Sequence, residues 1–359
     1  MTQIVTVRRM RQDDSMHTAG PPPPPRAPGI KDVAAIAGVS WKTVSNVVHN
    51  RPNVRPATRT RVEAAIAQLG YRPSLAGRQL RRGRTDTLAL ALPEIVTPYF
   101  GAVAQTVIAA ADEHGFSVLI DVTGGSPERE MAVAQGYRTR HIDGIIFSPL
   151  NLTATELAEH RDTTPMVLLG EHITGSGLDH VGIDNVGSAV QATEHLLARG
   201  RRRIAFLGVQ PGGPSSTGDI RLEGYLQALT GAGLELEPGL VVTTTSYTRG
   251  EGELRVRELL AAKTKLDAIV CGNDLLAIGA LKALREAGVD VPGQVGVVGW
   301  DGGEEGAFAN PALTTIAPDV DAIARLAVAA LVDRIEGSTL PATELVAPHR
   351  LVARLSSAR

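Results

Sequence analysis

The 359-residue chain has little cysteine, few aromatic residues and no long hydrophobic run. Its one cysteine, Cys271, excludes an internal disulfide and fits a reducing compartment. No apolar stretch approaches the length that crosses a bilayer, and the N-terminus lacks the apolar core of a signal peptide. We therefore expect a cytoplasmic protein with no membrane partner.

The sequence motifs of common enzymes are also missing. There is no HExxH, no GxSxG and no pair of cysteines at metal-ligand spacing. Residues Gly213 to Gly218 have the spacing of a phosphate-binding loop, but Asp219 stands where that loop needs a lysine. We therefore expect neither catalysis nor a cofactor or metal.

Residues 30–50, IKDVAAIAGVSWKTVSNVVHN, predict two short helices separated by a tight turn. Asp32 is expected to cap the first helix, and Gly38 is expected to end it, because glycine adopts a left-handed conformation at little cost. Ser40 is expected to cap the second helix. The inward face of that helix would carry Val44, Val47 and Val48.

Two helices joined by a short glycine-containing turn are typical of the helix-turn-helix, whose second helix enters the DNA major groove. The residues expected to meet base edges are Trp41, Lys42, Thr43, Ser45 and Asn46. A surface helix would usually carry Glu and Lys at such positions. The alternative is a small helical hairpin within a core.

The charge distribution supports a nucleic-acid partner. Residues 30–84 hold eleven Lys or Arg and two acidic residues, a net charge of +9. The whole chain has a net charge of −2 and the first 29 residues one of +2, so the remainder carries −13. A compact basic segment on an acidic body favours binding to phosphates, which releases counterions.

A third helix is predicted in RTRVEAAIAQLG, capped by Thr58 and ended by Gly70, and it would complete a small domain over residues 30–73. Residues 1–29 include the run Pro21–Pro25 and are expected to be a disordered tail.

Residues 74–84, SLAGRQLRRGR, have no apolar face and are expected to fold only on a partner. Leu80 lies between Arg78 and Arg81, and an apolar residue among arginines suits a wedge in the DNA minor groove. The alternative is a solvated linker.

From residue 85 onward, short β-branched or Leu-rich runs alternate with amphipathic helical segments. This pattern predicts an α/β effector domain over residues 85–359, with two parallel sheets in two lobes. The first lobe would comprise about 85–203 and 316–340, and the second about 204–315 and 341–359.

Ligands of such sheets bind beyond the carboxyl ends of the strands, which places them in the cleft between two facing lobes. Side chains near these ends supply aromatic rings, an arginine fork and carboxylates, which suit a polyhydroxylated or heterocyclic small molecule. The candidates are Tyr99, Phe100, Ser148, Thr217, Arg221, Tyr247, Asn273, Asp274 and Asp301. Asn273 and Asp274 could instead simply cap a helix.

The chain resembles the lactose/galactose-repressor family of bacterial transcription factors over residues 30 to about 355. In the head and hinge, the resemblance is carried by DVAAIAGVSWKTVSNVVHN, TRTRVEAAIAQLGYRPS and LAGRQL. In the body it is carried by VTPYF, VGIDN, STGDIRLEGY, CGNDLLAIGALKALREAGVDVP and VGVVGWDGGEEGAFANPALTTI.

The resemblance implies a helix-turn-helix head and a periplasmic-binding-protein-like pair of lobes that dimerises. Two heads would read a pseudo-palindromic operator in double-stranded DNA. By motif, Trp41, Lys42 and Asn46 would read bases and Leu80 would be the minor-groove wedge. Arg221, Asp301, Asn273 and Tyr247 match effector contacts, and Phe100 and Thr217 match contacts seen with some ligands.

Three departures bear on specificity. Asn46 stands where arginine is common, and asparagine favours adenine. Gly77 replaces the usual alanine of the hinge helix, which weakens that helix. Gly170 stands where some sugar-binding members place an aspartate.

We therefore expect a homodimeric repressor of a carbohydrate-use operon, located with the nucleoid when bound to DNA and controlled by a sugar or related metabolite. Alternatives are a purine or nucleoside corepressor, control by a protein partner, a solute-binding protein and an enzyme. The effector, the operator, the sign of the response and the choice between dimer and tetramer stay open.

Overall fold

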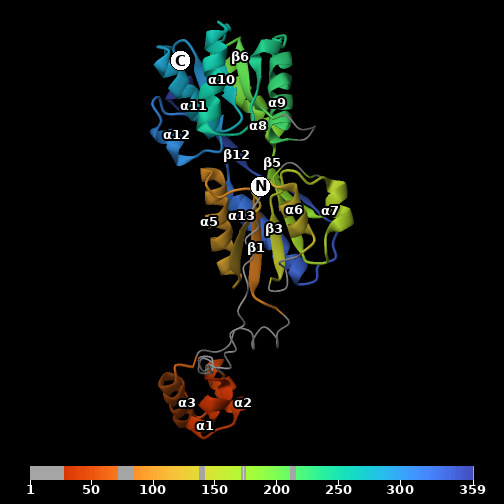
Figure 1. Cartoon of the computed structure of the whole chain (residues 1–359), viewed down its shortest axis with the longest axis vertical. Coiled ribbons are helices and arrows are strands. Elements are labelled where there is room, and N and C mark those ends of the chain that lie inside the picture. Colours follow the sequence, from red (N-terminus) through yellow and green to blue (C-terminus); the bar gives the residue numbers. More distant parts are fainter. Residues whose placement is uncertain are drawn as a thin grey trace, which may run out of the picture. The chain divides into compact units, whose positions relative to one another are not determined.

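The computed structural model describes residues 28–71, 84–136, 142–170, 173, 175–210 and 216–358. The chain divides into two compact units, Met1–Arg81 and Arg82–Arg359 (Figure 1). Three predicted DNA-binding residues, Arg78, Leu80 and Arg81, lie outside the described residues, as does most of the predicted tail. None of the described helices is long and apolar enough to span a bilayer.

The described part of the first unit, residues 28–71, forms three helices around a small apolar core. They are α1 (Ile30–Ala37), α2 (Trp41–Val48) and α3 (Pro56–Leu69). Gly38 ends α1 with a φ of +62°, and the Ser40 hydroxyl caps α2 by accepting from the Thr43 N–H at 3.1 Å. Both features confirm the predicted turn. Val33, Val44 and Val62 are fully buried where the three helices meet.

Two predicted helix starts in this unit are wrong. Asp32 lies inside α1, where its carboxylate accepts from the Gly29 N–H at 2.7 Å, so Gly29 is the first capping residue. Helix α3 begins at Pro56 rather than after Thr58. Proline is favoured at the first helical position because its missing N–H would be unsatisfied there anyway.

The second unit contains two six-stranded sheets, which form two lobes (Figure 1). The first sheet has the order β11-β5-β4-β3-β1-β2, from β1 (Thr87–Leu92), β2 (Ser117–Val122), β3 (Gly144–Phe147), β4 (Met166–Leu169), β5 (Asp179–Ile183) and β11 (Glu344–Ala347). The second has the order β12-β10-β9-β8-β6-β7, from β6 (Ile204–Val209), β7 (Val241–Thr243), β8 (Ala268–Cys271), β9 (Gly296–Trp300), β10 (Thr314–Pro318) and β12 (His349–Val352).

Helices cover both faces of each sheet. Around the first sheet they are α5 (Pro98–Glu113), α6 (Pro127–Ala134), α7 (Ala154–His160) and α13 (Val320–Ile335). Around the second they are α8 (Asn185–Leu197), α9 (Thr217–Gly231), α10 (Arg249–Ala261), α11 (Asp274–Glu286) and α12 (Glu304–Phe308), with 3-10 turns η2 (Pro238–Leu240) and η3 (Leu355–Ser357).

The strand side chains alternate between these two layers. In β1, Leu88 and Leu90 pack in the core with α5 and α13, whereas Ala91 packs with α6 and α7. In β6, Phe206 packs with α8 and α9, whereas Leu207 packs with α10 and α11. Burial on both faces explains the nearly continuous apolar runs from which parallel strands were predicted.

Three expectations about the sheets are corrected by the strand pairing. The sheets are not wholly parallel, because β12 runs antiparallel to β10. The assignment of residues 341–359 to the second lobe is wrong for β11, which pairs with β5 in the first sheet. Likewise β10 extends to Pro318 in the second sheet, so the return to the first lobe begins after residue 316. Long-range pairing decides these positions, and local pattern does not reveal it.

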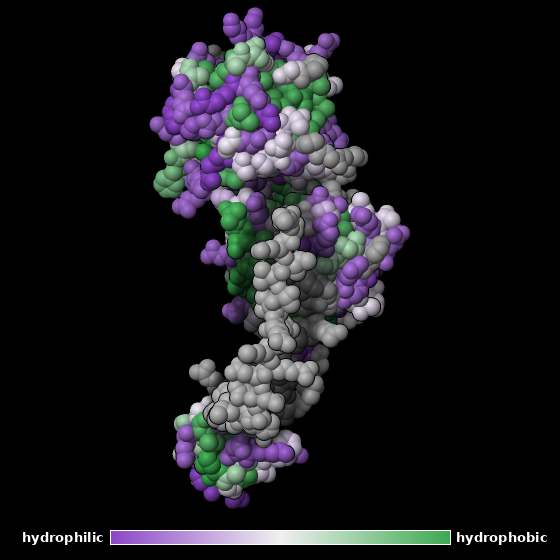
Figure 2. Space-filling view, in the orientation of Figure 1, coloured by the Kyte–Doolittle hydropathy of each residue, from purple (hydrophilic) through white to green (hydrophobic). Residues whose placement is uncertain are grey.

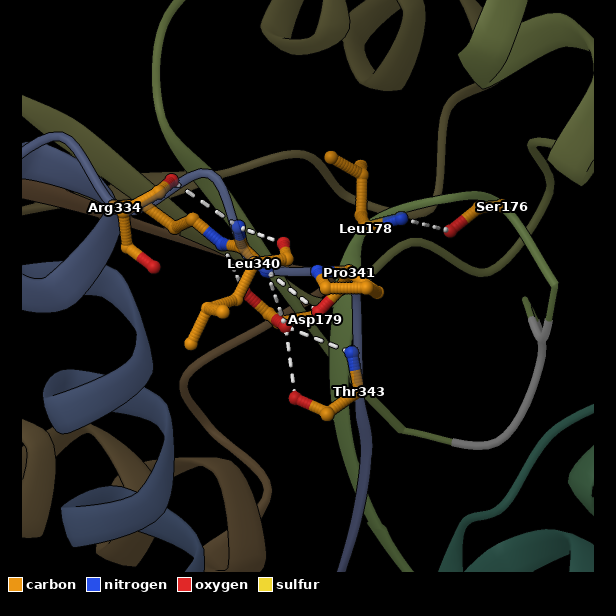
Figure 3. Close-up of polar contacts among 8 residues, drawn as sticks. Ser176, Leu178, Asp179, Arg334, Leu340, Pro341 and Thr343 are labelled. Carbon is orange, nitrogen blue, oxygen red and sulfur yellow. Dashed lines mark hydrogen bonds and ion pairs between the residues drawn. The ribbon is translucent and has the colours of Figure 1, made fainter.

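An ion pair between the buried Asp179 and the half-buried Arg334 joins three segments of the first lobe (Figure 3). Arg334, near the end of α13, donates to Asp179 Oδ2 at 2.6 Å and to Oδ1 at 3.0 Å. Asp179 Oδ1 also accepts from the Thr343 N–H and hydroxyl, both at 2.9 Å. Burial alone raises the pKa of Asp179, but these donors outweigh it and hold the pKa below its usual value. The pair thereby fixes β5, α13 and the approach to β11.

Candidate functional site

The five predicted base-reading residues lie on α2, away from the core of the first unit. Trp41 is 51% exposed and Lys42 is exposed, whereas Thr43, Ser45 and Asn46 are half-buried. On the same helix, Val44 and Val47 are buried. The helix therefore presents an aromatic ring, an amine, hydroxyls and an amide on its accessible side, which are groups that reach base edges and phosphates.

The loop after α2 is held by an arginine that the sequence did not single out. Arg59 on α3 donates to the Asn50 side-chain oxygen at 2.9 Å and to the Arg51 carbonyl at 2.8 Å. Asn50 has a φ of +52°, in the left-handed region that asparagine tolerates. These contacts join the end of α2 to α3 and so set the position of α2 in this unit.

A cavity of about 490 Å³ lies in the second unit, at the carboxyl ends of strands from both sheets. Its walls include residues at or after the ends of β1, β3, β4 and β5 and of β6, β7, β8, β9 and β10. Eight predicted effector residues line it: Tyr99, Phe100, Ser148, Thr217, Arg221, Tyr247, Asn273 and Asp301. The topology thus brings together residues that are up to about 200 positions apart in the chain.

The wall from the first lobe is largely aromatic and apolar. Tyr99 and Phe100 lie in the first turn of α5, with ring centroids 5.4 Å apart at an interplanar angle of 64°. Leu92, Val103 and Leu169 extend this wall. Edge-to-face rings held by neighbouring aliphatic groups form a firm surface on which a ligand ring can pack.

Arg221, in the second turn of α9, is the central cation of the opposite wall. It is 6% exposed, and its guanidinium lies 4.0 Å from the centroid of the Trp300 ring. Its Nε donates to Asn185 Oδ1 at 2.7 Å, and its Nη1 donates to the Gly272 carbonyl. These described partners are neutral, so the positive charge is retained while the side chain is held in place.

Tyr247 reaches the cavity through a gap that glycine provides. Its hydroxyl donates to the Gly208 carbonyl. A Cβ at Gly272 would lie 2.9 Å from this hydroxyl, and one at Gly218 would lie 2.2 Å from the Gly208 carbonyl oxygen. Larger residues at these two positions would therefore displace Tyr247 or the backbone beneath it.

Asn273 and Asp301 follow β8 and β9 on the same wall. Asn273 caps α11, because its Oδ1 accepts from the Leu276 N–H at 2.8 Å, and it also lines the cavity. Asp301 has a φ of +106°, which is unusual for a residue with a side chain. The Asp301 N–H donates a hydrogen bond to the Ile316 carbonyl at 2.9 Å. Backbone strain of this kind is concentrated at functional sites.

Asp274 does not line the cavity, and its prediction as an effector-facing residue differs from what the structure shows. Its side chain is 4% exposed and accepts from the Thr315 hydroxyl at 2.7 Å and from the Gly303 N–H at 2.8 Å. Burial raises the pKa of Asp274 to about 6, although both donors oppose the shift. As the first residue of α11, it points behind the wall that Asn273 forms.

Several residues of the site were missed from the sequence. Glu94 and Gln210 line the cavity, and Asn185 binds Arg221. Gly170 and Trp300 lie at the ends of predicted strands, and the structure places both at the site: Gly170 lines the cavity and Trp300 stacks on Arg221. Asn185 lies two positions after the end of β5, whose sequence DHVGI was not predicted as a strand because it contains Asp, His and Gly. Recognising that strand would have placed Asn185 at a carboxyl end and therefore near the cleft.

Known proteins share both units. A model of the lacI family of bacterial regulatory proteins matches residues 29–74, and a periplasmic binding protein-like domain matches residues 193–357. The HTH-type transcriptional regulator CelR of Thermobifida fusca is 34% identical over 92% of this chain and 98% of its own. A solved CelR–cellobiose complex is 32% identical, covers 92% and 99% of the two chains, and has a TM-score of 0.69.

The Lac repressor bound to ONPG in the repressed state superposes with a TM-score of 0.83 at 25% identity, over 92% of this chain and all of the other. Sequence and fold thus agree over the head and both lobes. The chain belongs to the LacI family of bacterial regulatory proteins and is a DNA-binding transcription regulator.

Proposed function

We propose that this protein is a homodimeric repressor of a carbohydrate-use operon, acting in the cytoplasm, whose operator binding is controlled by a neutral sugar in the inter-lobe cleft. One observation carries the proposal. The same chain holds a helix-turn-helix with an exposed recognition face and a separate cleft lined by aromatic rings, an arginine and a carboxylate.

The chemistry of the cleft supports a neutral polyhydroxylated ligand. The charged side chains among its described lining residues are Glu94, Arg221 and Asp301, so the lining does not favour a phosphate or another strong anion. Arg221 and Asp301 can each hold two hydroxyls, while Phe100 can pack on a ring face. A relative has been solved as a complex with cellobiose, so we take cellobiose as the first candidate.

On the DNA side, Trp41, Lys42, Thr43, Ser45 and Asn46 would contact one operator half-site. Asn46 would favour adenine by a bidentate contact. Two heads of a dimer would then require a pseudo-palindromic site, because half-site symmetry mirrors protein symmetry. Leu80, flanked by Arg78 and Arg81, would enter the minor groove between the half-sites.

The surface of the first lobe supports a second copy as its partner. Edge strand β2 exposes Leu119, Ile120 and Val122, and the adjacent α5 exposes Ile108. Figure 2 shows hydrophobic residues gathered on the side of the first lobe where α5 lies. An exposed apolar edge strand favours association, and a two-fold interface would cover it in both copies.

Control of DNA binding would follow from linkage. A sugar that contacts both walls favours one angle between the lobes over others. Since the N-terminal lobes carry the heads, this angle would set whether both heads can engage one operator. The free energy that couples sugar and DNA must then be reciprocal, so the operator would alter sugar affinity by the same factor.

The proposal is tested with the full-length protein, genomic fragments and a sugar panel headed by cellobiose. We expect a gel shift with a fragment that carries a pseudo-palindrome, and a change in that shift when the effective sugar is added. Asn46→Ala should weaken the shift. A protein that binds no duplex at low salt would refute the regulatory role, and one that binds DNA but responds to no sugar would refute the effector class.

A further inference from the structure

Asn185 is buried beside the cleft without lining it. It is 3% exposed and is the first residue of α8, two positions after the end of β5, where the chain crosses from the first lobe. Its Oδ1 accepts from Arg221 Nε at 2.7 Å, and its Nδ2 donates to the Ile183 carbonyl at 3.3 Å. Both ends of the amide are therefore used, and their donor and acceptor roles fix its orientation.

The backbone around this contact is tightly packed. A Cβ at Gly224 would lie 2.2 Å from the Val186 carbonyl oxygen, so α9 approaches the start of α8 at backbone distance. Gly224 lies three residues after Arg221 and hence on the same side of α9. The two helices are thereby held where the asparagine and the arginine can meet.

We propose that Asn185 is a positioning residue for effector binding, which orients the Arg221 guanidinium and ties it to the first inter-lobe crossover. The inference rests on the proposed role of Arg221 as a sugar contact. In the described part of the chain, two of the five guanidinium N–H groups are used, by Asn185 and by Gly272. The remaining three N–H groups can donate to hydroxyl oxygens of a ligand only if the plane of the guanidinium group is held in one orientation.

A neutral amide suits this task better than a carboxylate. Asparagine supplies an acceptor at the right place without neutralising the cation, so the full charge of Arg221 stays available for ligand hydroxyls. Because Asn185 begins α8 and is separated from β5 by Asp184 alone, a change in the crossover moves this acceptor. A change in the angle between the lobes can therefore shift the Arg221 guanidinium through this contact.

The test uses full-length wild type, Asn185→Ala, Asn185→Asp and the adjacent control Asp184→Asn. Asp184 caps α8 by accepting from the Gly187 N–H at 2.7 Å, and asparagine caps equally well, so this control keeps the helix start intact. Calorimetric titration with cellobiose gives the dissociation constant, and crystal structures without sugar give the position of Arg221. Circular dichroism establishes that each variant is folded.

We expect Asn185→Ala to raise the dissociation constant about tenfold or more, since a buried hydrogen bond to a charged group is lost. Arg221 should leave its place over Trp300 in the alanine variant and keep it in the aspartate variant, which should recover part of the affinity. The control should match wild type. A purely structural role of Asn185 would instead lower affinity equally in both variants.

The inference is overturned if Asn185→Ala keeps Arg221 in place, or if it binds cellobiose as tightly as wild type does. If wild type binds no cellobiose, the sugar assignment for that ligand fails. The position of Arg221 in the sugar-free crystals still decides the positioning role in that case.

Discussion

The two lobes of the second unit have the same layered construction, yet they give the cleft two different walls. The first lobe contributes Tyr99 and Phe100 with aliphatic neighbours, whereas the second contributes Arg221, Asn273 and Asp301. Both sets follow parallel strands. The comparison shows that the sheets fix the position of the ligand site. The residues after the strands can vary, so one lobe can supply ring packing while the other supplies hydrogen bonds.

The lobes also place their charged pairs differently. In the first, Asp179 is buried beneath Arg334. In the second, the ion pairs of α10 and α11 lie at the surface, where Lys282 meets Glu253 at 2.5 Å and Glu286 at 3.1 Å. A buried pair becomes costly when it is broken, whereas an exposed pair is screened by water and salt.

The largest effect is expected from breaking the buried pair of the first lobe. Arg334→Ala leaves the Asp179 carboxylate buried without its cation and should lower the free energy of unfolding by about 3 to 5 kcal/mol. Urea denaturation measures this value. Arg334→Lys keeps the charge but loses the two-pronged contact, so it should fall between alanine and wild type. Equal stability of all three proteins would contradict the assignment.

A second expected effect is a difference in the sign of pH dependence between the lobes. Burial raises the pKa of Asp274 from 3.8 to about 6, so the folded protein keeps a proton that the unfolded chain releases. Its contribution to the free energy of unfolding should fall by about 3 kcal/mol as pH rises from about 4 to about 6. For Asp179, whose pKa is lowered, the contribution is present above the unfolded pKa and is lost as pH falls through the folded pKa.

Denaturation of Asp274→Asn and Asp179→Asn between pH 3 and pH 7 separates the two cases. Relative to wild type, Asp274→Asn should gain stability as pH rises, and Asp179→Asn should lose it. The same trend in both variants would show that the pKa of one of the two carboxylates is shifted in the opposite direction to the one that its contacts and burial predict.

The walls of the cleft should differ in how much affinity each residue carries. Arg221→Ala should weaken cellobiose binding about a hundredfold, because a charged donor is lost from a buried site. Phe100→Ala should weaken it about tenfold through lost ring packing. Calorimetry measures both, with Leu236→Ala on an exposed part of the second lobe as the control. A larger loss at Phe100 than at Arg221 would reverse the proposed division of roles.

The sheet edges offer a further contrast, because β2 of the first lobe exposes Leu119 at 55% while β7 of the second ends in Thr243. Leu119→Asp should weaken self-association about tenfold or more, since it places a charge in the proposed interface. Sedimentation equilibrium gives the dimer constant. Thr243→Asp serves as the matched edge control and should leave that constant unchanged. An unaltered constant for Leu119→Asp would exclude β2 from the interface.

The smallest effect is expected at the surface pairs of the second lobe. Lys282→Ala removes the cation that Glu253 and Glu286 share, but these groups are solvated. The midpoint of thermal unfolding should therefore change little, and less at high salt than at low salt. A loss of stability comparable to that of Arg334→Ala would show that the ion pairs of the two lobes do not differ in strength through burial.

The local features of the head could be read from sequence because they depend on neighbours in the chain. Gly38 and Ser40 end one helix and begin the next through their own backbone and side-chain chemistry. The strands β5, β10, β11 and β12 could not be read this way. β5 and β10 contain polar residues or glycine within buried positions, and their place depends on partners far away in the chain.

The cleft shows the same division. Arg221 and Asp301 were expected at strand ends and do line the cavity, whereas Asp274, one position after Asn273, points behind the wall. Consecutive residues at a helix start face different directions, and only the contact of Asp274 with Thr315 shows that Asn273 is the one that faces the cavity. Asn185 was missed for a related reason, since its partner Arg221 is 36 positions away.

By itself, the sequence determined that a basic helix-turn-helix precedes an acidic α/β body, because caps, periodicity and charge are local properties of the chain. Only the tertiary structure decided which lobe β11 joins, how the two walls of the cleft differ and what holds Arg221. Those features depend on contacts between distant segments, and their free energy is gained only when the whole unit is folded.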